Sequence, residues 1–583
     1  MSESLNSLKR LGRYIKPYRV GFFLVILFTV MTAVFNAILP YVTGLPMTAI
    51  AEDLRAGRAI DFSYIIDCLI WILAIGIGYC VTQLLAGLLV ANVVQSSMKD
   101  LRKDIDEKIN RLPVSYFDKN QQGNILSRVT NDVDAVSGAL QQSFIGIINA
   151  VLSILMAASM MFYIQPLMAL ISMIMIPASI LISQGIVKVS QKYFQGMQNS
   201  LGDLNGYVQE NLTGFSVLKV YGREEETLTG FKNVNHQLKH YGFRAAFISG
   251  LMMPLVQLTA YITYIVMAVM GGLYVVSGVL LVGQLQAFIQ YIWQISQPMG
   301  NITQLSSVLQ SASAATKRVF EILDEPEEKE NIVDLELPET FLGHVRFNNV
   351  SFAYDPNKPL IQNLNFEVQP GQMVAVVGPT GAGKTTLINL LMRFYDVTEG
   401  AIEIDGIDTQ QIKRSDVRSL FGMVLQDAWL YEGTIMENIR FGNLEATDYE
   451  VVDASKIANV DHFIRTMPDG YDMAINSEGD NVSLGQKQLL TIARAVISNP
   501  KILILDEATS SVDTRLEALI QKAMDRVMKG RTSFVIAHRL STIREADLIL
   551  VMDKGSIIEQ GTHEELLAKG GFYEKLYNSQ FAE

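Results

Sequence analysis

The chain has 583 residues, enough for two to four domains, and 49% of them are hydrophobic, with a mean hydropathy of +0.23. This composition is too apolar for an ordinary soluble enzyme, so part of the chain must lie in lipid. Residues 1–330 carry 24 Lys and Arg against 23 Asp and Glu, whereas residues 331–583 carry 23 against 36, so the soluble part is acidic and lacks the basic surface that a nucleic-acid partner requires.

Apolar and basic residues alternate at the start of the chain. Leu5, Leu8 and Ile15 are interleaved with Lys9, Arg10, Arg13 and Lys16. The pattern is typical of a helix that lies on a membrane surface, and we expect one over residues 1–16. A flexible basic tail is the alternative.

Four long stretches in residues 17–322 contain no Asp, Glu, Lys or Arg. They are Val20–Ala51, Cys68–Met98, Ala135–Val187 and Ala245–Thr316. A charge at bilayer depth costs several kcal/mol, and a spanning helix needs about 20 apolar residues. The first two stretches have room for one span each and the last two for two each. We therefore predict an all-α, polytopic membrane domain of six transmembrane helices over residues 17–322.

The charged connectors between these spans indicate how the domain is oriented. Those between spans two and three and between spans four and five are rich in Lys and Arg, as is the N-terminus. By the positive-inside rule, all three lie in the cytoplasm of a cell whose plasma or inner membrane holds the spans. Leu101, Ile105 and Ile109 recur at helical spacing, so we expect the helices to extend into the cytoplasm. A separately folded loop domain is the alternative.

An acidic segment with a proline, Asp324–Glu330, marks a domain boundary, and we predict a linker over residues 323–340. After it, short β-branched runs alternate with helical segments. The runs are Val345–Phe352, Val374–Val377, Ile502–Leu505, Thr532–Ile536 and Leu548–Met552. This alternation predicts an α/β domain over residues 341–583.

A glycine-rich loop follows the second of these strands and opens a helix. It reads Gly378, Pro379, Thr380, Gly381, Ala382, Gly383, Lys384, Thr385, Thr386. Strand, loop and helix in this order form a P-loop, in which backbone N–H groups hold the phosphates of ATP. Lys384 would reach the β- and γ-phosphates, and the Thr385 hydroxyl would bind Mg²⁺. A plain glycine turn is the alternative, but it explains neither the lysine nor the context.

Two further polar positions follow apolar strands. Asp506 and Glu507 end the run Ile502–Leu505, where a buried strand tolerates acids only if a cation or a reaction needs them. We predict that Asp506 holds Mg²⁺ and that Glu507 is the general base for the attacking water. His538, after Thr532–Ile536, would contact the γ-phosphate. Solvated carboxylates and a structural histidine are the alternatives.

With these motifs in this order, the chain resembles the ATP-binding cassette family, specifically exporters with six spans and one cassette. The resemblance covers essentially the whole chain and implies further roles. Tyr354 would stack on adenine, Gln426 would reach the metal, and Asp513 would lie in the loop at the dimer interface. Ser483, Gly485 and Gln486 occupy the place of the signature loop. Two segments, 116–128 and 214–224, resemble the helices that couple cassette and spans.

The signature loop departs from the family pattern, which reads Leu-Ser-Gly-Gly-Gln. Leu484 stands where the first glycine belongs, and its Cβ would restrict the backbone and crowd the γ-phosphate. Glu507, His538 and Gln426 are all present, so the chain's own phosphate site should be competent. We therefore predict a heterodimer with one active and one degenerate ATP site. A homodimer is the alternative.

Met, aromatic and amide residues in the spans would suit a cavity for hydrophobic or amphipathic compounds. They include Met252, Met253, Gln257, Tyr261, Tyr264, Gln290, Tyr291, Trp293 and Gln294. Ordinary helix packing is the alternative for each of them. We expect ATP-driven efflux of the multidrug type, with a lipid or lipopeptide flippase, a peptide exporter, an ATP-gated channel and an importer as alternatives.

Overall fold

The computed structural model describes residues 10–329, 338, 340–425, 428–476, 481–506, 514–536 and 540–580. Contacts between residues divide the chain into two compact units. One comprises Met1–Leu112 and Asn120–Pro326, and we call it the membrane unit. The other comprises Pro113–Lys119 and Glu327–Glu583, and we call it the cassette unit. The cassette unit is thus discontinuous in sequence.

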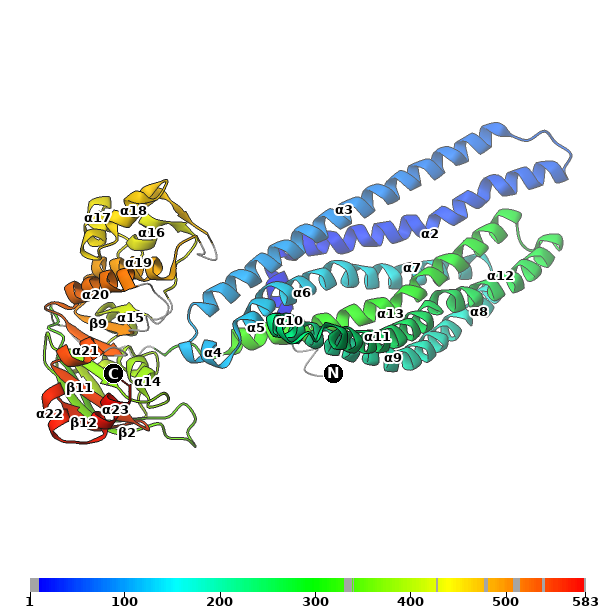
Figure 1. Ribbon diagram of the computed structural model, residues 1–583. Coiled ribbons are helices and arrows are strands. Elements are labelled where there is room, and N and C mark those ends of the chain that lie inside the picture. Colours follow the sequence, from blue (N-terminus) through cyan, green and yellow to red (C-terminus); the bar gives the residue numbers. More distant parts are fainter. Residues whose placement is uncertain are drawn as a thin grey trace. The chain divides into compact units, whose positions relative to one another are not determined.

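Long helices make up the membrane unit (Figure 1). They are α2 (Arg19–Arg55), α3 (Phe62–Ile109), α5 (Gln122–Ser127), α6 (Val133–Ala139), α7 (Ile145–Ile164), α8 (Pro166–Ser172), α9 (Met175–Thr213), α10 (Phe215–Tyr221), α11 (Glu224–Gly250), α12 (Met252–Val276) and α13 (Val282–Asp324), with a short 3-10 turn Lys16–Tyr18 before α2 and π-helical turns Arg128–Asp132 and Leu140–Phe144 beside α6. Helix α3 therefore continues well beyond its charge-free stretch, as expected for a cytoplasmic extension.

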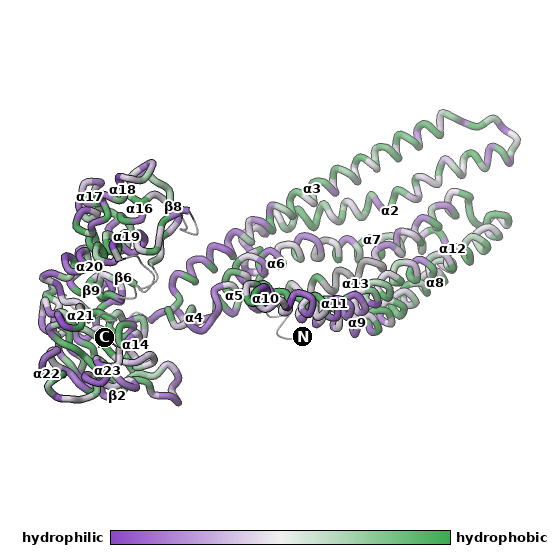
Figure 2. Tube along the Cα trace, viewed as in Figure 1, coloured by the Kyte–Doolittle hydropathy of each residue, from purple (hydrophilic) through white to green (hydrophobic). Residues whose placement is uncertain are grey.

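Five helical runs among the described residues are long and apolar enough to cross a membrane. They are Arg10–Arg55, Phe62–Ile109, Gln122–Ile164, Pro166–Thr213 and Glu224–Val276. The last predicted span corresponds to α13, which is 43 residues long but less apolar, because Gln284, Gln286, Gln290 and Gln294 interrupt its first half. Figure 2 shows hydrophobic residues concentrated along α8 and α12 and hydrophilic residues along the C-terminal end of α3.

The membrane unit holds two hydrophobic clusters. In the first, Phe288, Tyr291 and Ile292 of α13 are fully buried against α7, α8 and α12. In the second, Met98 and Leu101 of α3 are fully buried with Val319 and the N-terminal Leu11. Residues 10–15 are helical, and Leu11 packs into this cluster, which anchors the N-terminal helix on the bundle. Its place at a membrane surface stays a prediction.

Helices α2 and α13 approach each other closely at two glycines. A Cβ built on Gly283 would overlap the backbone carbonyl of Gly44, and a Cβ on Gly44 would overlap Gly283 in return. The Gly283 N–H donates a hydrogen bond to Thr48 Oγ1 at 3.0 Å across this contact. Small residues let helix backbones meet in membrane proteins, where packing rather than the hydrophobic effect drives association.

The cassette unit contains three sheets. A six-stranded sheet has the order β12-β11-β3-β10-β9-β6, and a four-stranded antiparallel sheet has the order β2-β1-β4-β5. Strands β7 and β8 form the third sheet. The strands of the cassette unit are β1 (Val345–Phe352), β2 (Ile361–Val368), β3 (Met373–Val377), β4 (Glu399–Ile404), β5 (Ile407–Asp408), β6 (Phe421–Val424), β7 (Gly433–Thr434), β8 (Ala474–Ile475), β9 (Ile502–Asp506), β10 (Thr532–Ile536), β11 (Leu548–Asp553) and β12 (Ser556–Gly561). Strands β3, β6, β9, β10 and β11 are parallel, which confirms the predicted α/β fold.

Some helices of the cassette unit cover the six-stranded sheet, and others pack on α19 (Leu484–Ile497) instead (Figure 1). The α-helices after residue 340 are α14 (Lys384–Leu391), α15 (Arg414–Ser419), α16 (Ile435–Arg440), α17 (Asp448–Ile457), α18 (Asp461–Thr466), α19, α20 (Thr514–Met528), α21 (Leu540–Glu545), α22 (His563–Ala568) and α23 (Phe572–Gln580). Val374 and Val376 of β3 pack on α14, while Leu503 and Leu505 of β9 pack on α19 and α20. Since β3 and β9 are buried on both faces, their sequences are continuously apolar rather than alternating.

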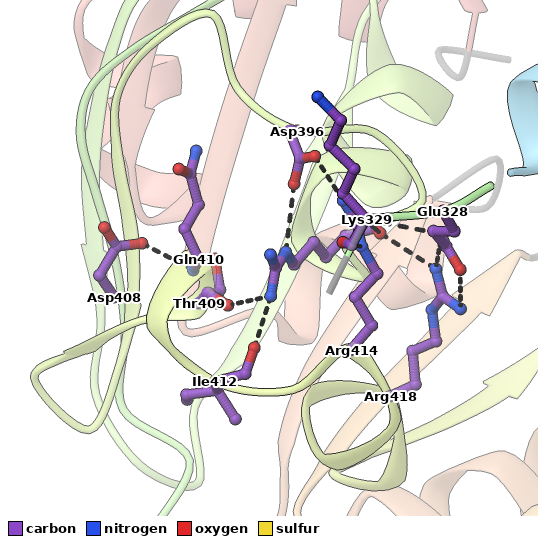
Figure 3. A network of polar contacts seen from close by, with 10 residues as sticks. Glu328, Lys329, Asp396, Asp408, Thr409, Gln410, Ile412, Arg414 and Arg418 are labelled. Atoms are coloured by element: carbon purple, nitrogen blue, oxygen red, sulfur yellow. Dashed lines mark hydrogen bonds and ion pairs between the residues drawn. The ribbon is translucent and has the colours of Figure 1, made fainter. Parts of the chain in front are cut away.

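The start of the predicted linker is bound to the cassette (Figure 3). Arg418 donates to Glu328 through two nitrogens, at 2.5 and 3.1 Å, and Arg414 Nε donates to the Lys329 carbonyl at 3.1 Å. Arg414 is only 5% exposed, and its guanidinium also pairs with Asp396 and bonds the Arg393 carbonyl. We call these six residues, Glu328, Lys329, Arg393, Asp396, Arg414 and Arg418, the linker clamp. It fixes where the chain enters the cassette.

Candidate functional site

Parallel strands bring the predicted phosphate site to one edge of the six-stranded sheet. Ile536, the last residue of β10, pairs with Val376 of β3 on one side and with Asp506 of β9 on the other. The carboxyl ends of the three strands therefore lie side by side, and ligands bind at this edge in open α/β sheets. The glycine loop starts directly after β3, so it lies beside Asp506.

The loop itself has the backbone shape of a phosphate cradle. Gly378, Gly381 and Gly383 have φ angles of 155°, 83° and 104°, in the left-handed region that glycine favours. At Gly378 a Cβ would overlap the Met552 carbonyl, so a larger residue is excluded there by space as well as by angle. Gly383 is the N-cap of α14, whose first N–H groups have no helical partner and can hold an anion.

Lys384 is the cation of this site. Its Nζ donates to the carbonyls of Gly378 at 2.6 Å and Pro379 at 3.2 Å, so the side chain folds back over the loop. Burial lowers the pKa of Lys384, and the nearby Asp506 carboxylate raises it in part. The ammonium is partly stripped of water in this position, which strengthens its attraction for a phosphate.

Tyr354 connects the loop helix to an aromatic cluster. Its hydroxyl donates to Thr386 Oγ1 at 3.3 Å, and its ring is 43% exposed, so a face remains available for a base. The ring also makes an edge contact with Tyr395, with centroids 4.9 Å apart. Stacking of adenine on Tyr354, which the resemblance implies, stays a prediction.

Tyr395 contacts a helix that sequence reasoning did not assign to the cassette. Its hydroxyl donates to Asp118 Oδ2 at 2.5 Å, and Asp118 lies on α4 (Val114–Lys119), within the cassette unit. Burial and this hydrogen bond raise the pKa of Tyr395. Tyr116 on the same helix is buried. Only residues 116–119 of the first predicted coupling segment thus lie on α4, whose Asp118 is 277 residues from Tyr395 in sequence, while residues 120–128 belong to the membrane unit. Its coupling role stays a prediction.

The second predicted coupling segment forms α10 in the membrane unit. Val217, Val220 and Tyr221 of this short helix are 61%, 80% and 74% exposed. Exposed apolar side chains that gather on one short helix can mark a binding surface. Its docking on a cassette stays a prediction.

The signature loop opens α19 through a capping box. The Ser483 N–H donates to Gln486 Oε1 at 2.8 Å, and the Gln486 N–H bonds the Ser483 hydroxyl at 3.4 Å. Leu484 is the first residue of the helix, and its φ is not positive, so its Cβ causes no backbone strain in this conformation. The expected crowding stays a prediction, since the Leu484 side chain is 43% exposed. Gly485 is buried.

Several predicted site residues lie outside the described part of the chain. They are Gln426, Glu507, Asp513 and His538. The strands that precede three of them end together, since Val424 of β6 pairs with Leu505 and Ile536 of β10 pairs with Asp506. Their roles stay predictions from sequence.

The donors at this edge suit Mg²⁺, which prefers oxygen ligands and usually shares them with phosphates. The Thr385 hydroxyl is exposed on the first turn of α14, and the Asp506 carboxylate lies near Lys384. Among the residues that the structure describes, three or more His, Cys, Asp or Glu side chains nowhere gather into a metal site of their own. A hydroxyl and one carboxylate fit an ion that arrives with a nucleotide.

The membrane unit contains a cavity of about 580 Å³ between α2, α3, α12 and α13. Of the residues predicted to line a cargo site, five do so: Met253, Gln257, Gln290, Trp293 and Gln294. Tyr291 is fully buried instead, and its hydroxyl donates to the Ala37 carbonyl at 2.6 Å. Asn36 and Tyr79 also line the cavity, and sequence reasoning missed both because neighbouring helices only meet in the fold.

Comparison with known proteins agrees with this geometry. A model of the ABC transporter transmembrane region matches residues 22–299, and a model of the ABC transporter cassette matches residues 361–510. The chain is 45% identical to the fatty acid ABC transporter ATP-binding/permease protein of Mycobacterium tuberculosis, over 89% of this chain and 82% of that protein. It is 39% identical to an uncharacterized ABC transporter ATP-binding protein of Bacillus subtilis, over 99% and 95%. It is 36% identical to the ATP-dependent lipid A-core flippase of Syntrophus aciditrophicus, over 85% and 82%.

Proposed function

The chain belongs to the ABC transporter family, in which ATP hydrolysis drives transport, and we propose that it exports hydrophobic or amphipathic compounds as one half of a dimer. The cavity among α2, α3, α12 and α13 is the observation that carries the proposal. It joins apolar side chains to uncharged polar ones, a lining that suits a molecule with an apolar body and a polar end.

Among amphiphiles, we favour those with acyl chains over a broad range of drugs. One relative is named for fatty acids and another for flipping lipid A-core, and the multidrug type was expected only from the general character of the spans. The cavity volume of about 580 Å³ lies within the range of ordinary ligand sites, roughly 300–1,000 Å³.

ATP supplies the free energy at the sheet edge. The N–H groups around Gly381 and the start of α14 would hold the phosphates, and Lys384 would neutralise their charge. Thr385 and Asp506 would hold Mg²⁺, which when bound lowers the charge of the transferred phosphoryl group. Glu507 would orient the attacking water and take its proton. Tyr354 and the loops with Gln426, Asp513 and His538 would complete the site.

We further propose that the partner is a different half-transporter. The exposed Leu484 would project from the start of α19 toward a γ-phosphate that the opposite cassette holds. An isobutyl group there would push out the phosphate, while this chain's own loop, lysine and predicted base are complete. A partner with an ordinary signature would give one active and one degenerate site. A homodimer would join two competent phosphate sites to two crowded signatures.

Inside-out vesicles with the chain and its partner test the proposal. In a plasma or inner membrane with the cassette cytoplasmic, addition of ATP to the outside should move a labelled acyl compound inward. The Glu507→Gln variant should bind ATP without moving it. Passive movement that nucleotide merely opens would indicate a channel, and outward movement would indicate an importer. Vigorous, transport-coupled ATPase activity of the chain alone would contradict the heterodimer.

A further inference from the structure

Uncharged amides dominate the polar lining of the membrane cavity. Five of them face it, from three helices: Asn36 of α2, Gln257 of α12, and Gln290, Gln294 and Gln297 of α13. None of the described residues that line the cavity is Asp, Glu, Lys, Arg or His. The apolar part consists of Leu39, Pro40, Met253, Val256 and Trp293. The cavity is thus polar but carries no charge.

Gln294 is the most demanding of these amides. Both its Nε2 and its Oε1 are buried, and neither has a hydrogen-bond partner among the described residues. An unpaired polar group in an interior costs about 1–3 kcal/mol, so such groups are rare in folded proteins unless something binds them. The side-chain carbonyl of Gln290 is only weakly hydrogen-bonded, because it accepts from the Thr43 hydroxyl at 3.4 Å.

The chemistry of an amide defines the group that would satisfy it. Each amide has N–H donors and a carbonyl acceptor side by side, so its best partner also donates and accepts. A protonated carboxyl does so, since its carbonyl accepts from N–H and its O–H donates to the amide oxygen. A carboxylate only accepts, and it would face the glutamine carbonyls with like partial charge.

Because the described lining contains no cation, it favours the protonated carboxyl over the carboxylate. Taking a carboxylate from water into a low-dielectric site without a counter-charge is costly, so burial raises the pKa of such an acid, by up to about 3–5 units when burial is complete. An acid bound in this cavity would therefore hold its proton to a higher pH than the same acid in water, where its pKa is near 4.3.

We propose that the amide cluster around Gln294 is a head-group site for the neutral, protonated carboxyl of an acyl chain, which enters the cavity together with its proton. The inference rests on the proposed function and narrows it, since it names the chemical form of the cargo. No bond is made or broken beyond the uptake of one proton from water by the carboxylate.

Trp293, which lines the cavity beside Gln294, provides the probe. The chain has three tryptophans, and replacing Trp71 and Trp429 with Phe leaves Trp293 as the one tryptophan of this chain. Its signal is the difference from the same sample with Trp293→Phe, because the partner emits as well. The full-length chain with its partner, in nanodiscs, is titrated with nitroxide-labelled palmitic acid, whose label quenches nearby tryptophan. The same labelled chain as a primary amide and as a sulfonate tests the form that binds.

The acid and the neutral amide should both quench Trp293, and the permanently charged sulfonate should bind at least about tenfold more weakly. Above the acid's own pKa, its apparent affinity relative to the amide should fall about tenfold per pH unit, because only the protonated form binds. The Gln294→Met variant, similar in shape, should weaken acid and amide alike by about three- to tenfold, the worth of one hydrogen bond. The matched Gln83→Met variant, in a separate cavity on α3, should bind as the parent does.

Three results would overturn the head-group site: a sulfonate that binds as tightly as the acid, an acid affinity that does not change with pH relative to the amide, or equal binding by the Gln294 and Gln83 variants. ATP-driven movement of palmitic acid in vesicles separates this from the proposed function. If movement occurs and Gln294→Met leaves it unchanged, the head-group site is wrong and the cargo class stands. If quenching follows the expected pattern but ATP moves no acid, the proposed transport is wrong.

Discussion

The candidate sites of the two compact units differ in the polar groups that they offer to a ligand. The cassette uses full charge and backbone: Lys384 and Asp506 lie at the end of a sheet, and glycines bare their N–H groups. The membrane cavity uses side-chain amides and no charge. A phosphate is anionic in any environment, so a fixed cation suits it. A cargo that must leave through lipid is better held by groups that themselves tolerate lipid, and charge is expensive there.

The largest effect should come from the cassette's predicted base. Changing Glu507 to Gln keeps the shape and removes the carboxylate, so ATP turnover should fall by about 10² to 10⁴ while ATP binding remains. Phosphate release measured beside binding of a labelled nucleotide checks this. Glu445→Gln, an exposed glutamate on the same unit, is the control and should turn over ATP normally. If Glu507→Gln hydrolysed ATP at the normal rate, the Glu507 carboxylate would not be the general base of the cassette.

The next effect concerns the linker clamp. Arg414→Ala removes a buried guanidinium and takes one donor each from Asp396 and from the Arg393 and Lys329 carbonyls, so the free energy of unfolding of the cassette should fall by about 3 kcal/mol. Thermal unfolding of the purified chain in detergent measures it. Arg465→Ala breaks an ion pair on the surface, with Asp461, and should cost under about 1 kcal/mol. Equal shifts would mean that burial of the clamp does not matter.

In the membrane unit, size rather than charge should be critical. Gly283→Ala forces α13 away from Gly44 and should destabilise the bundle by about 1–3 kcal/mol. Gly272→Ala on α12, where a Cβ meets nothing within 4 Å, should be neutral or slightly stabilising because alanine favours a helix. The midpoint of heat inactivation in detergent compares the two. A harmless Gly283→Ala would show that α2 and α13 can separate freely.

The smallest effect tests the hydrogen bond that holds α4. Tyr395→Phe removes only the hydroxyl that bonds Asp118 and should cost about 1 kcal/mol. A double-mutant cycle with Asp118→Ala, which removes the acceptor, isolates the pair, and the number of ATP molecules used per cargo moved should rise in both single variants. Additive effects of the two changes would mean that the contact carries no coupling.

Local signals in the sequence predicted most of the cassette. The continuous apolar run before Gly378 indicated a buried parallel strand, and the glycines indicated the loop, because both depend on neighbours in sequence. The sixth span, on α13, was predicted from its lack of charge, but α13 is not among the five described helical runs that are apolar enough to cross a membrane, so this span stays a prediction. The two signals differ there because an uncharged amide lowers the hydropathy of a helix but costs far less in lipid than an ion does.

Contacts between residues far apart in the chain could not be predicted from the sequence. The place of α4 in the cassette unit depends on Tyr395, whose partner is 277 residues away. Asn36 reaches the cavity only because α2 crosses beside α13. The sequence alone also did not show that Leu484 begins a helix, in which its Cβ fits without backbone strain.

Because the cassette unit is discontinuous in sequence, it cannot complete its folding until late in synthesis on the ribosome. Helix α4 leaves the exit tunnel long before the strands that it joins, at a synthesis rate of about 5–20 residues per second, so it waits for many seconds before Tyr395 exists. The nascent chain must keep Tyr116 and its neighbours from other partners during that interval. A fragment that starts at the linker would never receive α4, and its aromatic surface around Tyr395 would stay bare, a reason to express the chain whole.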